Sequence, residues 1–309
     1  MPISIDSGRL HVEMFSPEDG LVTTRFDRAC HIYKVVLDGK HSFCVPEQQI
    51  KSRVTSNGNG LCAQFMWPEL GLETTAGERF AQLGVGLLTQ VKDNQPYDKF
   101  GKYEAELSDM RMETMPDRVL FVHDIPECRG VSVRIYREAI LWENTLTVFT
   151  NMENTGERTL DLSEYNHNFI SIDNLPVGPG YHLHIPFDRN LSNLTMVCST
   201  IDNQQPVSEL ILMENNQTAT WSRPMDGLTY FKRTEQRDIL PMARYHWKLT
   251  HDTSPAWVSE MLSFAPHALA LWGVEHCVCP EVYVKINVEP GVKQAWSRTW
   301  IFGCRPEDV

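Results

Sequence analysis

The sequence predicts an all-β protein, mostly antiparallel, with few and short helices. Apolar residues repeat with a period of two in several segments, turn-forming dipeptides separate these segments, and helical periodicity never persists beyond about two turns. The stretch that comes nearest to helical periodicity runs from Trp257 to Leu262. No internal repeat or linker-like run divides the chain, so we expect one domain over residues 1–309.

Two β-hairpins are predicted from alternating segments on either side of a turn. Residues 131–136 and 146–150 each alternate apolar and polar side chains, with a short polar interruption between them. Near the C-terminus, residues 282–288 alternate, Pro290-Gly291 supplies a turn, and residues 295–302 form the returning strand. We therefore expect one hairpin in the middle of the chain and a second hairpin that closes it.

Composition limits the classes of partner and location. The 309 residues include 28 Lys and Arg against 40 Asp and Glu, a formal net charge of −12. This balance disfavours nucleic acid and anionic membranes as partners. The N-terminus lacks the pattern of a targeting signal, and no apolar run approaches the roughly 18 residues of a membrane span. We expect a cytoplasmic protein whose eight cysteines are reduced and mostly buried.

Three motifs follow one another in the centre of the chain. They are Asn154-Thr155-Gly156, Asn166-His167-Asn168-Phe169 and His184-Ile185-Pro186-Phe187-Asp188. A Pro-x-x-Gly turn and an Asp-Gly pair precede them, and a glutamate before a Pro-Gly turn follows them. In this order, over residues 10–303, the chain resembles the galactose mutarotase (aldose 1-epimerase) superfamily. The resemblance implies a twisted β-supersandwich.

The resemblance also implies an aldose 1-epimerase-like enzyme that interconverts the anomers of a monosaccharide or sugar derivative, free or phosphorylated. It assigns Glu281 as the base for the C1 hydroxyl and His167 as the acid for the ring oxygen. Acting on one pyranose, the two side chains should enter one pocket about a sugar-ring width apart. A nearby carboxylate should favour a proton on His167 at neutral pH. Both steps are proton transfers, so no cofactor is expected.

Three further residues are assigned to sugar binding. Arg79 is similar in position to the superfamily's sugar-binding arginine, and Asn166 adjoins His167 in its motif. His123 follows the apolar strand of residues 119–122 and is expected to enter the pocket from a different strand. The chain departs from the superfamily pattern over residues 77–86, where members carry a histidine followed by glycine and this chain carries no histidine.

Two arrangements of histidine and cysteine are incomplete as metal sites. His182-x-His184 and Cys277-x-Cys279 each place two donors on one face of a strand. A catalytic zinc ion needs three protein ligands and a structural one needs four, so we expect no metal. Two alternative functions remain: a non-catalytic carbohydrate-binding protein on the same fold, and a cupin-like metalloenzyme that isomerises sugars.

Overall fold

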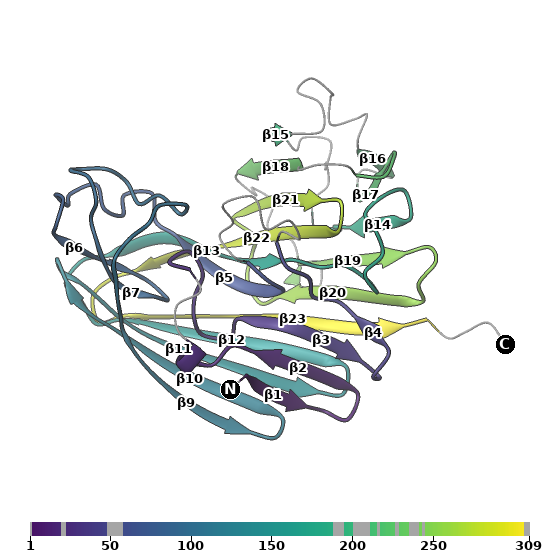
Figure 1. Cartoon of the computed structure of the whole chain (residues 1–309), viewed down its shortest axis with the longest axis horizontal. Helices are drawn as coiled ribbons and strands as arrows, with labels where there is room; N and C mark the ends of the chain where they lie inside the picture. Colours follow the sequence, from purple (N-terminus) through teal and green to yellow (C-terminus); the bar gives the residue numbers. More distant parts are fainter. Residues whose placement is uncertain are drawn as a thin grey trace.

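The computed structural model describes residues 2–19, 23–47, 58–187, 195–199, 211–214, 217–225, 229–234, 241–242 and 245–305. Within these ranges the protein consists of two ten-stranded sheets and one three-stranded sheet, with antiparallel pairing throughout (Figure 1). The one helical element described is the 3-10 helix η1, Pro17–Asp19. The predicted all-β class is confirmed. No helix in the described part of the chain has the length and hydrophobicity of a membrane span.

The first large sheet has the order β1-β2-β3-β5-β13-β22-β21-β18-β15, with β4 paired to β3. Its strands are β1 Ile3–Asp6, β2 Leu10–Met14, β3 Ile32–Leu37, β4 His41–Ser42, β5 Leu61–Met66, β13 Leu160–Asn168, β15 Thr195–Ser199, β18 Thr229–Thr234, β21 Ala268–Val274 and β22 Cys277–Val288. Strands β5, β13 and β22 lie at its centre, so each has a neighbour on both sides.

The second large sheet has the order β16-β17-β14-β19-β20-β23-β12-β11-β10-β9. Its strands are β9 Asp109–Met115, β10 Arg118–Cys128, β11 Val131–Trp142, β12 Thr145–Asn154, β14 Tyr181–His184, β16 Ile211–Glu214, β17 Thr218–Trp221, β19 His246–His251, β20 Ala256–Leu262 and β23 Lys293–Cys304. The most helix-like stretch of the sequence is therefore strand β20. Asp188, which ends the third motif, lies outside the described residues.

The small sheet, β6-β7-β8, is an insertion between β5 and β9. It comprises β6 Arg79–Gln82, β7 Gly86–Thr89 and β8 Ala105–Leu107. Strands β6 and β7 contact β10 of the second sheet, and Figure 1 shows them at the left end of the molecule. The insertion thus covers one end of the two large sheets.

The central predicted hairpin is confirmed and the C-terminal one is wrong. β11 and β12 pair around a tight turn in which Glu143 has a φ of 50°. β22 pairs with β13 and β21, whereas β23 pairs with β12 and β20, so these strands belong to different sheets. The turn at Pro290-Gly291 carries the chain from one sheet to the other. Alternation predicts a strand correctly but does not specify its partner.

The main hydrophobic core lies between the two large sheets. Val12 and Leu37 of the first sheet belong to the same buried cluster as Val119, Leu146 and Trp300 of the second. Each strand contributes alternate residues because its side chains point to opposite faces of the pleat. This core holds the sheets together but leaves the outer face of the first sheet for other groups.

A buried network of charged side chains crosses the same core. Arg298 on β23 donates hydrogen bonds to Glu164 on β13 at 3.1 Å and to Glu260 on β20 at 3.0 Å. Arg137 on β11 donates to Asp27 at 2.8 Å and lies 3.7 Å from Glu164. None of the five side chains is more than 3% exposed. The network therefore connects β13 to three strands of the second sheet.

Replacing Arg298 by methionine should lower the free energy of unfolding by about 3–5 kcal/mol, because Glu164 and Glu260 would remain buried without their shared cation. Urea denaturation measures the change. Arg111→Met is the matched control, since the Arg111 side chain is 70% exposed and its pair with Asp124 should contribute less than about 1 kcal/mol. Equal, small losses in both variants would contradict a structural role for the network.

A second buried titratable group lies just before β3. The His31 ring is 5.0 Å from the Phe15 ring and 5.8 Å from the Phe26 ring. Its Nε2 atom has no hydrogen-bond partner within the described residues. Burial lowers the pKa of His31 from 6.5 to about 4. Between these values the unfolded chain binds a proton that the native protein does not, so stability rises with pH across this window.

Lowering the pH from about 7 to about 4 should therefore remove roughly 3 kcal/mol of stability through His31 alone. Urea denaturation at several pH values should show a shallower pH dependence for His31→Phe than for the wild type. His182→Gln, at a residue whose side chain is 29% exposed, should keep the wild-type slope. Identical slopes for wild type and His31→Phe would contradict a buried neutral His31.

Candidate active site

Strand β13 positions the candidate site, and it carries polar side chains on both of its faces. Its even-numbered residues from 164 to 168 face the second sheet, with Glu164 in the buried charge network. Tyr165 and His167 point to the opposite, outer face of the first sheet, as does Phe169, which follows the strand. Both faces are buried, so the polar groups on each face need hydrogen-bond or ion-pair partners on that same face.

Three adjacent strands place Cys62, His167 and Glu281 side by side on that outer face. Cys62 on β5 is directly opposite His167 on β13. The β13–β22 register pairs Tyr165 with Tyr283, so the next residues on the same face are His167 and Glu281. The two residues assigned to catalysis from the sequence are therefore cross-strand neighbours.

His167 and Glu281 are in direct contact. The His167 Nδ1 atom lies 2.7 Å from Glu281 Oε1, and their side chains are 2% and 4% exposed. The expected spacing of a sugar-ring width is wrong for this structure. Cross-strand neighbours on one face have Cβ atoms only about 5 Å apart, so two long side chains meet when no group separates them.

Arg25 contacts His167 on its other side. Its Nη2 atom lies 3.3 Å from His167 Nε2, and its Nε atom donates to Gln64 Oε1 at 2.7 Å. Its Nη1 atom donates to Glu47 Oε1 at 3.0 Å. Gln64 Oε1 also accepts a hydrogen bond from the Tyr165 hydroxyl at 2.7 Å and lies 3.0 Å from His167 Nε2. This set of contacts fixes the plane of the imidazole.

Burial and neighbouring charges set the protonation of the pair in opposite ways. Burial would raise the pKa of Glu281, but the hydrogen bond from His167 and the charge of Arg25 outweigh it and lower that pKa, so the carboxylate is ionised. Burial lowers the pKa of His167, Arg25 lowers it further, and Glu281 acts in the opposite direction. The neutral imidazole is therefore favoured, contrary to the expected protonated form.

Aromatic rings surround the pair. Tyr165 stacks on Tyr283 at 4.3 Å between centroids, and the His167 ring stacks on Phe169 at 5.1 Å. Phe26 meets His167 edge-on at 5.1 Å. Such apolar walls reduce the local dielectric and strengthen the electrostatic interaction of His167 with its neighbours.

Arg79, assigned to sugar binding from the sequence, is not part of this centre. It begins β6 in the small sheet, its side chain is 53% exposed, and it forms an ion pair with Glu106 on β8. Arg79 is the exposed first residue of β6, and the three residues that follow it are buried. The arginine beside His167 is Arg25, which lies in the segment before β3.

Asn166 and His123 also lie outside the centre. Asn166 faces the second sheet because side chains alternate along β13, and its amide donates to the His167 carbonyl oxygen at 2.7 Å. His123 belongs to β10 of the second sheet, where its Nε2 atom is 2.5 Å from the Ser108 hydroxyl. Its Nδ1 atom lies 3.9 Å from Asp27, so His123 belongs to the surroundings of the buried charge network.

The insertion brings a loop to the edge of the site. The Phe100 side chain is exposed, and the Arg25 Cζ atom lies 5.7 Å from its ring centroid. The charge of the neighbouring Lys99 contributes to the lowered pKa of Glu281. Sequence reasoning missed this loop, as it missed Arg25 and Gln64, because none of them belongs to a motif or to a strand pattern shared with His167.

The two incomplete metal patterns have different environments. His182 pairs with Asp252 at 2.9 Å, and His184 is 3.0 Å from the Thr218 hydroxyl, so each ring has a local partner. Cys279 instead joins His167 and Glu281: one donor atom from each residue lies within 4.8 Å of the others. The cysteines whose side chains are described are all free thiols. The sequence pattern associates Cys279 with Cys277 and gives no sign that Cys279 lies beside His167 and Glu281.

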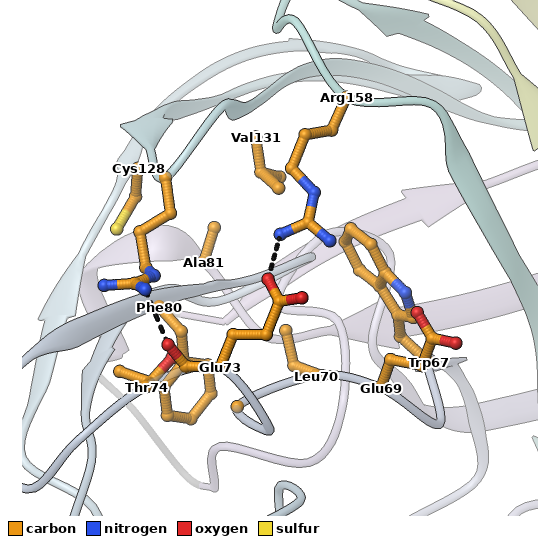
Figure 2. Close-up of a pocket in the computed structure, with 12 residues that line it drawn as sticks. Trp67, Glu69, Leu70, Glu73, Thr74, Phe80, Ala81, Cys128, Val131 and Arg158 are labelled. Carbon is orange, nitrogen blue, oxygen red and sulfur yellow. Dashed lines mark hydrogen bonds and ion pairs between the residues drawn. The ribbon is translucent and has the colours of Figure 1, made fainter. Parts of the chain in front are cut away.

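A separate pocket lies between the insertion and the strands beside it (Figure 2). Arg158 pairs with Glu73 at 3.1 Å (Figure 2). Arg129 pairs with Glu78 at 3.3 Å and also donates to the Glu73 carbonyl oxygen at 2.5 Å. Trp67 forms part of its wall. None of the site residues predicted from the sequence lines this pocket, and its arginines already have acidic partners, so we place the candidate active site at His167 and Glu281.

Comparison with known proteins identifies the fold. No family model and no curated protein matches the sequence. The Slr1438 protein of Synechocystis sp. PCC 6803 superposes with a TM-score of 0.58 at 11% identity, over 99% of this chain and 96% of that one. A GalM/aldose epimerase homologue from C. elegans gives 0.58 at 10% identity, over 99% of both chains. A galactose mutarotase-like protein from Lactobacillus casei ATCC 334 gives 0.55 at 12% identity, over 98% and 100%.

These likenesses extend over nearly the full length of the chains. The protein therefore has the galactose mutarotase-like β-supersandwich fold, as the sequence motifs implied. At 10–12% identity, the likeness concerns the fold alone, and the function has to be argued from the site.

Proposed function

We propose that the protein is an aldose 1-epimerase-like isomerase that interconverts the anomers of a monosaccharide or sugar derivative. The observation that carries this proposal is the buried contact between His167 and Glu281 on the outer face of a mutarotase-like sheet. A carboxylate and an imidazole next to each other suit a reaction made of two proton transfers. Arg25 supports the proposal because it orients the imidazole.

The reaction requires one proton to leave the anomeric hydroxyl and one to reach the ring oxygen. Glu281 receives the hydroxyl proton, since its lowered pKa leaves it ionised. His167 must first take up a proton from solvent, because its lowered pKa favours the neutral ring, and the imidazolium then gives that proton to the ring oxygen. Glu281 is the neighbour that favours this protonated form. The sugar must insert between the two side chains and replace their 2.7 Å contact by two hydrogen bonds of about 2.6–3.2 Å.

One observation favours the second candidate function, a non-catalytic carbohydrate-binding protein. The acid and the base touch each other, and burial and Arg25 disfavour the protonated imidazole on which the acid step depends. A protein that only binds a sugar needs hydrogen-bonding groups at the site but no proton on His167. Anomer exchange distinguishes the two functions, because only the enzyme accelerates it.

The variants Glu281→Gln and His167→Asn should each slow anomer exchange by roughly 10²–10⁴-fold, the usual contribution of a positioned proton-transfer group. Exchange is measured by NMR between the α and β signals of a panel of free and phosphorylated aldoses. Both substitutions keep a polar side chain of similar size, so circular dichroism should show an unchanged β spectrum.

Arg79→Gln is the control for these variants, because Arg79 lies on the exposed side of the insertion and should not affect the exchange rate. A wild type that binds a sugar without accelerating exchange would favour the carbohydrate-binding function. A Glu281→Gln variant with the wild-type exchange rate would exclude Glu281 as the base.

A further inference from the structure

Three donor atoms of different chemistry converge on the outer face of β13 and β22. His167, Cys279 and Glu281 contribute a nitrogen, a sulfur and a carboxylate oxygen that all lie within 4.8 Å of one another. All three residues are buried, and Cys279 and Glu281 share one face of β22. Imidazole, thiolate and carboxylate are the three ligand types that zinc accepts in proteins.

The spacing of these atoms is close to that of a tetrahedral zinc site. Zinc bonds of about 2.0–2.3 Å place nitrogen and oxygen ligands about 3.3 Å apart, and sulfur and oxygen ligands about 3.5 Å apart. The observed separation between Cys279 Sγ and Glu281 Oε1 is 3.7 Å, and that between His167 Nδ1 and Glu281 Oε1 is 2.7 Å. The third separation, between the His167 nitrogen and Cys279 Sγ, is within 4.8 Å, compared with about 3.6 Å in a tetrahedral site, so the side chains must rotate to bring three ligands around one ion.

The orientation of the His167 ring also suits a ligand role. Within the described residues, its buried Nδ1 atom has no hydrogen-bond partner of normal geometry, although Glu281 Oε1 is close. Its Nε2 atom has an acceptor, Gln64 Oε1, at 3.0 Å and a donor, Arg25 Nη2, at 3.3 Å. With its proton on Nε2, the ring donates to Gln64 as metal-bound histidines donate to an outer partner, and the Nδ1 lone pair faces the other two donors.

The charges and hydrogen bonds around the sulfur also suit a bound cation. Burial raises the pKa of Cys279 well above its usual range, so the ion itself must displace the thiol proton; the backbone N–H of Asn168, which donates to Cys279 Sγ at 3.2 Å, favours the resulting thiolate. A thiolate and the Glu281 carboxylate together neutralise a divalent ion. Arg25, the cation that contacts His167, is already paired with Glu47 at 3.0 Å, which reduces its repulsion of a metal.

We propose that His167, Cys279 and Glu281 form a zinc site in which the fourth coordination position is left for water or a ligand. On binding, the Cys279 thiol releases its proton to solvent and the sulfur bonds to the ion. Zinc would bind both His167, the acid of the proposed epimerase, and Glu281, its base, so zinc should inhibit anomer exchange. This last consequence rests on the proposed function, whereas the metal site itself does not.

Cobalt(II) is the direct probe, because a tetrahedral cobalt–thiolate site gives a sulfur-to-metal charge-transfer band and intense visible bands. Wild-type protein in a thiol-free reducing buffer should develop these bands with one equivalent of cobalt and lose them when zinc is added. Cys279→Ser should abolish the charge-transfer band and weaken zinc binding by about 100-fold or more, measured by competition with a coloured chelator.

Cys277→Ser is the matched control. Cys277 is buried on the same face of β22, two residues away, but is outside the donor group, so its variant should keep the cobalt spectrum. Thermal unfolding checks that both variants fold. If Cys279→Ser does not fold, the wild-type spectrum still tests the site, because a site with a thiolate ligand must give the charge-transfer band. The proposal is overturned by a wild type without the charge-transfer band, or by a band that survives in Cys279→Ser.

Zinc should also slow anomer exchange by the wild type in proportion to occupancy of the site, and a chelator should restore the rate. Exchange that is unaffected at full occupancy would contradict the overlap of the two sites. Wild-type protein that shows the cobalt bands but never accelerates exchange would count against the proposed function and leave the metal site supported.

Discussion

Strand β13 carries buried polar groups on both faces, and the rest of the candidate site depends on how they are compensated. On the inner face, Glu164 is held by Arg298 and approached by Arg137. On the outer face, His167 lies between Glu281 and Arg25. An uncompensated charge at either place would cost several kcal/mol. A one-residue slip of β13 would exchange the two sets of side chains, so these pairs specify its register together with hydrophobic packing.

This arrangement makes the site compact. Arg25 comes from the segment before β3, Gln64 from β5 and Glu281 from β22, so the imidazole is held by groups from three separate segments. The same compactness brings the proposed acid and base into contact and places Cys279 beside them. Sugar binding and metal binding are therefore competing uses of one small set of atoms, and each requires the His167–Glu281 contact to open.

The fold and the two central residues were predictable from the sequence, but their environment was not. Period-two alternation correctly predicts β22 and β23, yet the same alternation fits a hairpin or two strands in different sheets. The ordered motifs identify His167 and Glu281. Arg25 carries no comparable signal, because its contacts are with residues distant in the sequence. Arg79 matches the superfamily's sugar-binding arginine only by its position in the sequence. Its exposure follows from an insertion whose fold the motifs do not describe.

The proposed function requires the outer face of β13 and β22 to bind the anomeric centre of a sugar. A crystal structure of the protein with a bound aldose shows whether it does. We predict that the C1 hydroxyl lies within hydrogen-bond distance of the Glu281 carboxylate and the ring oxygen within the same reach of His167, with their direct contact opened. A sugar bound instead in the pocket beside Trp67, with the His167–Glu281 contact still closed, would contradict the account.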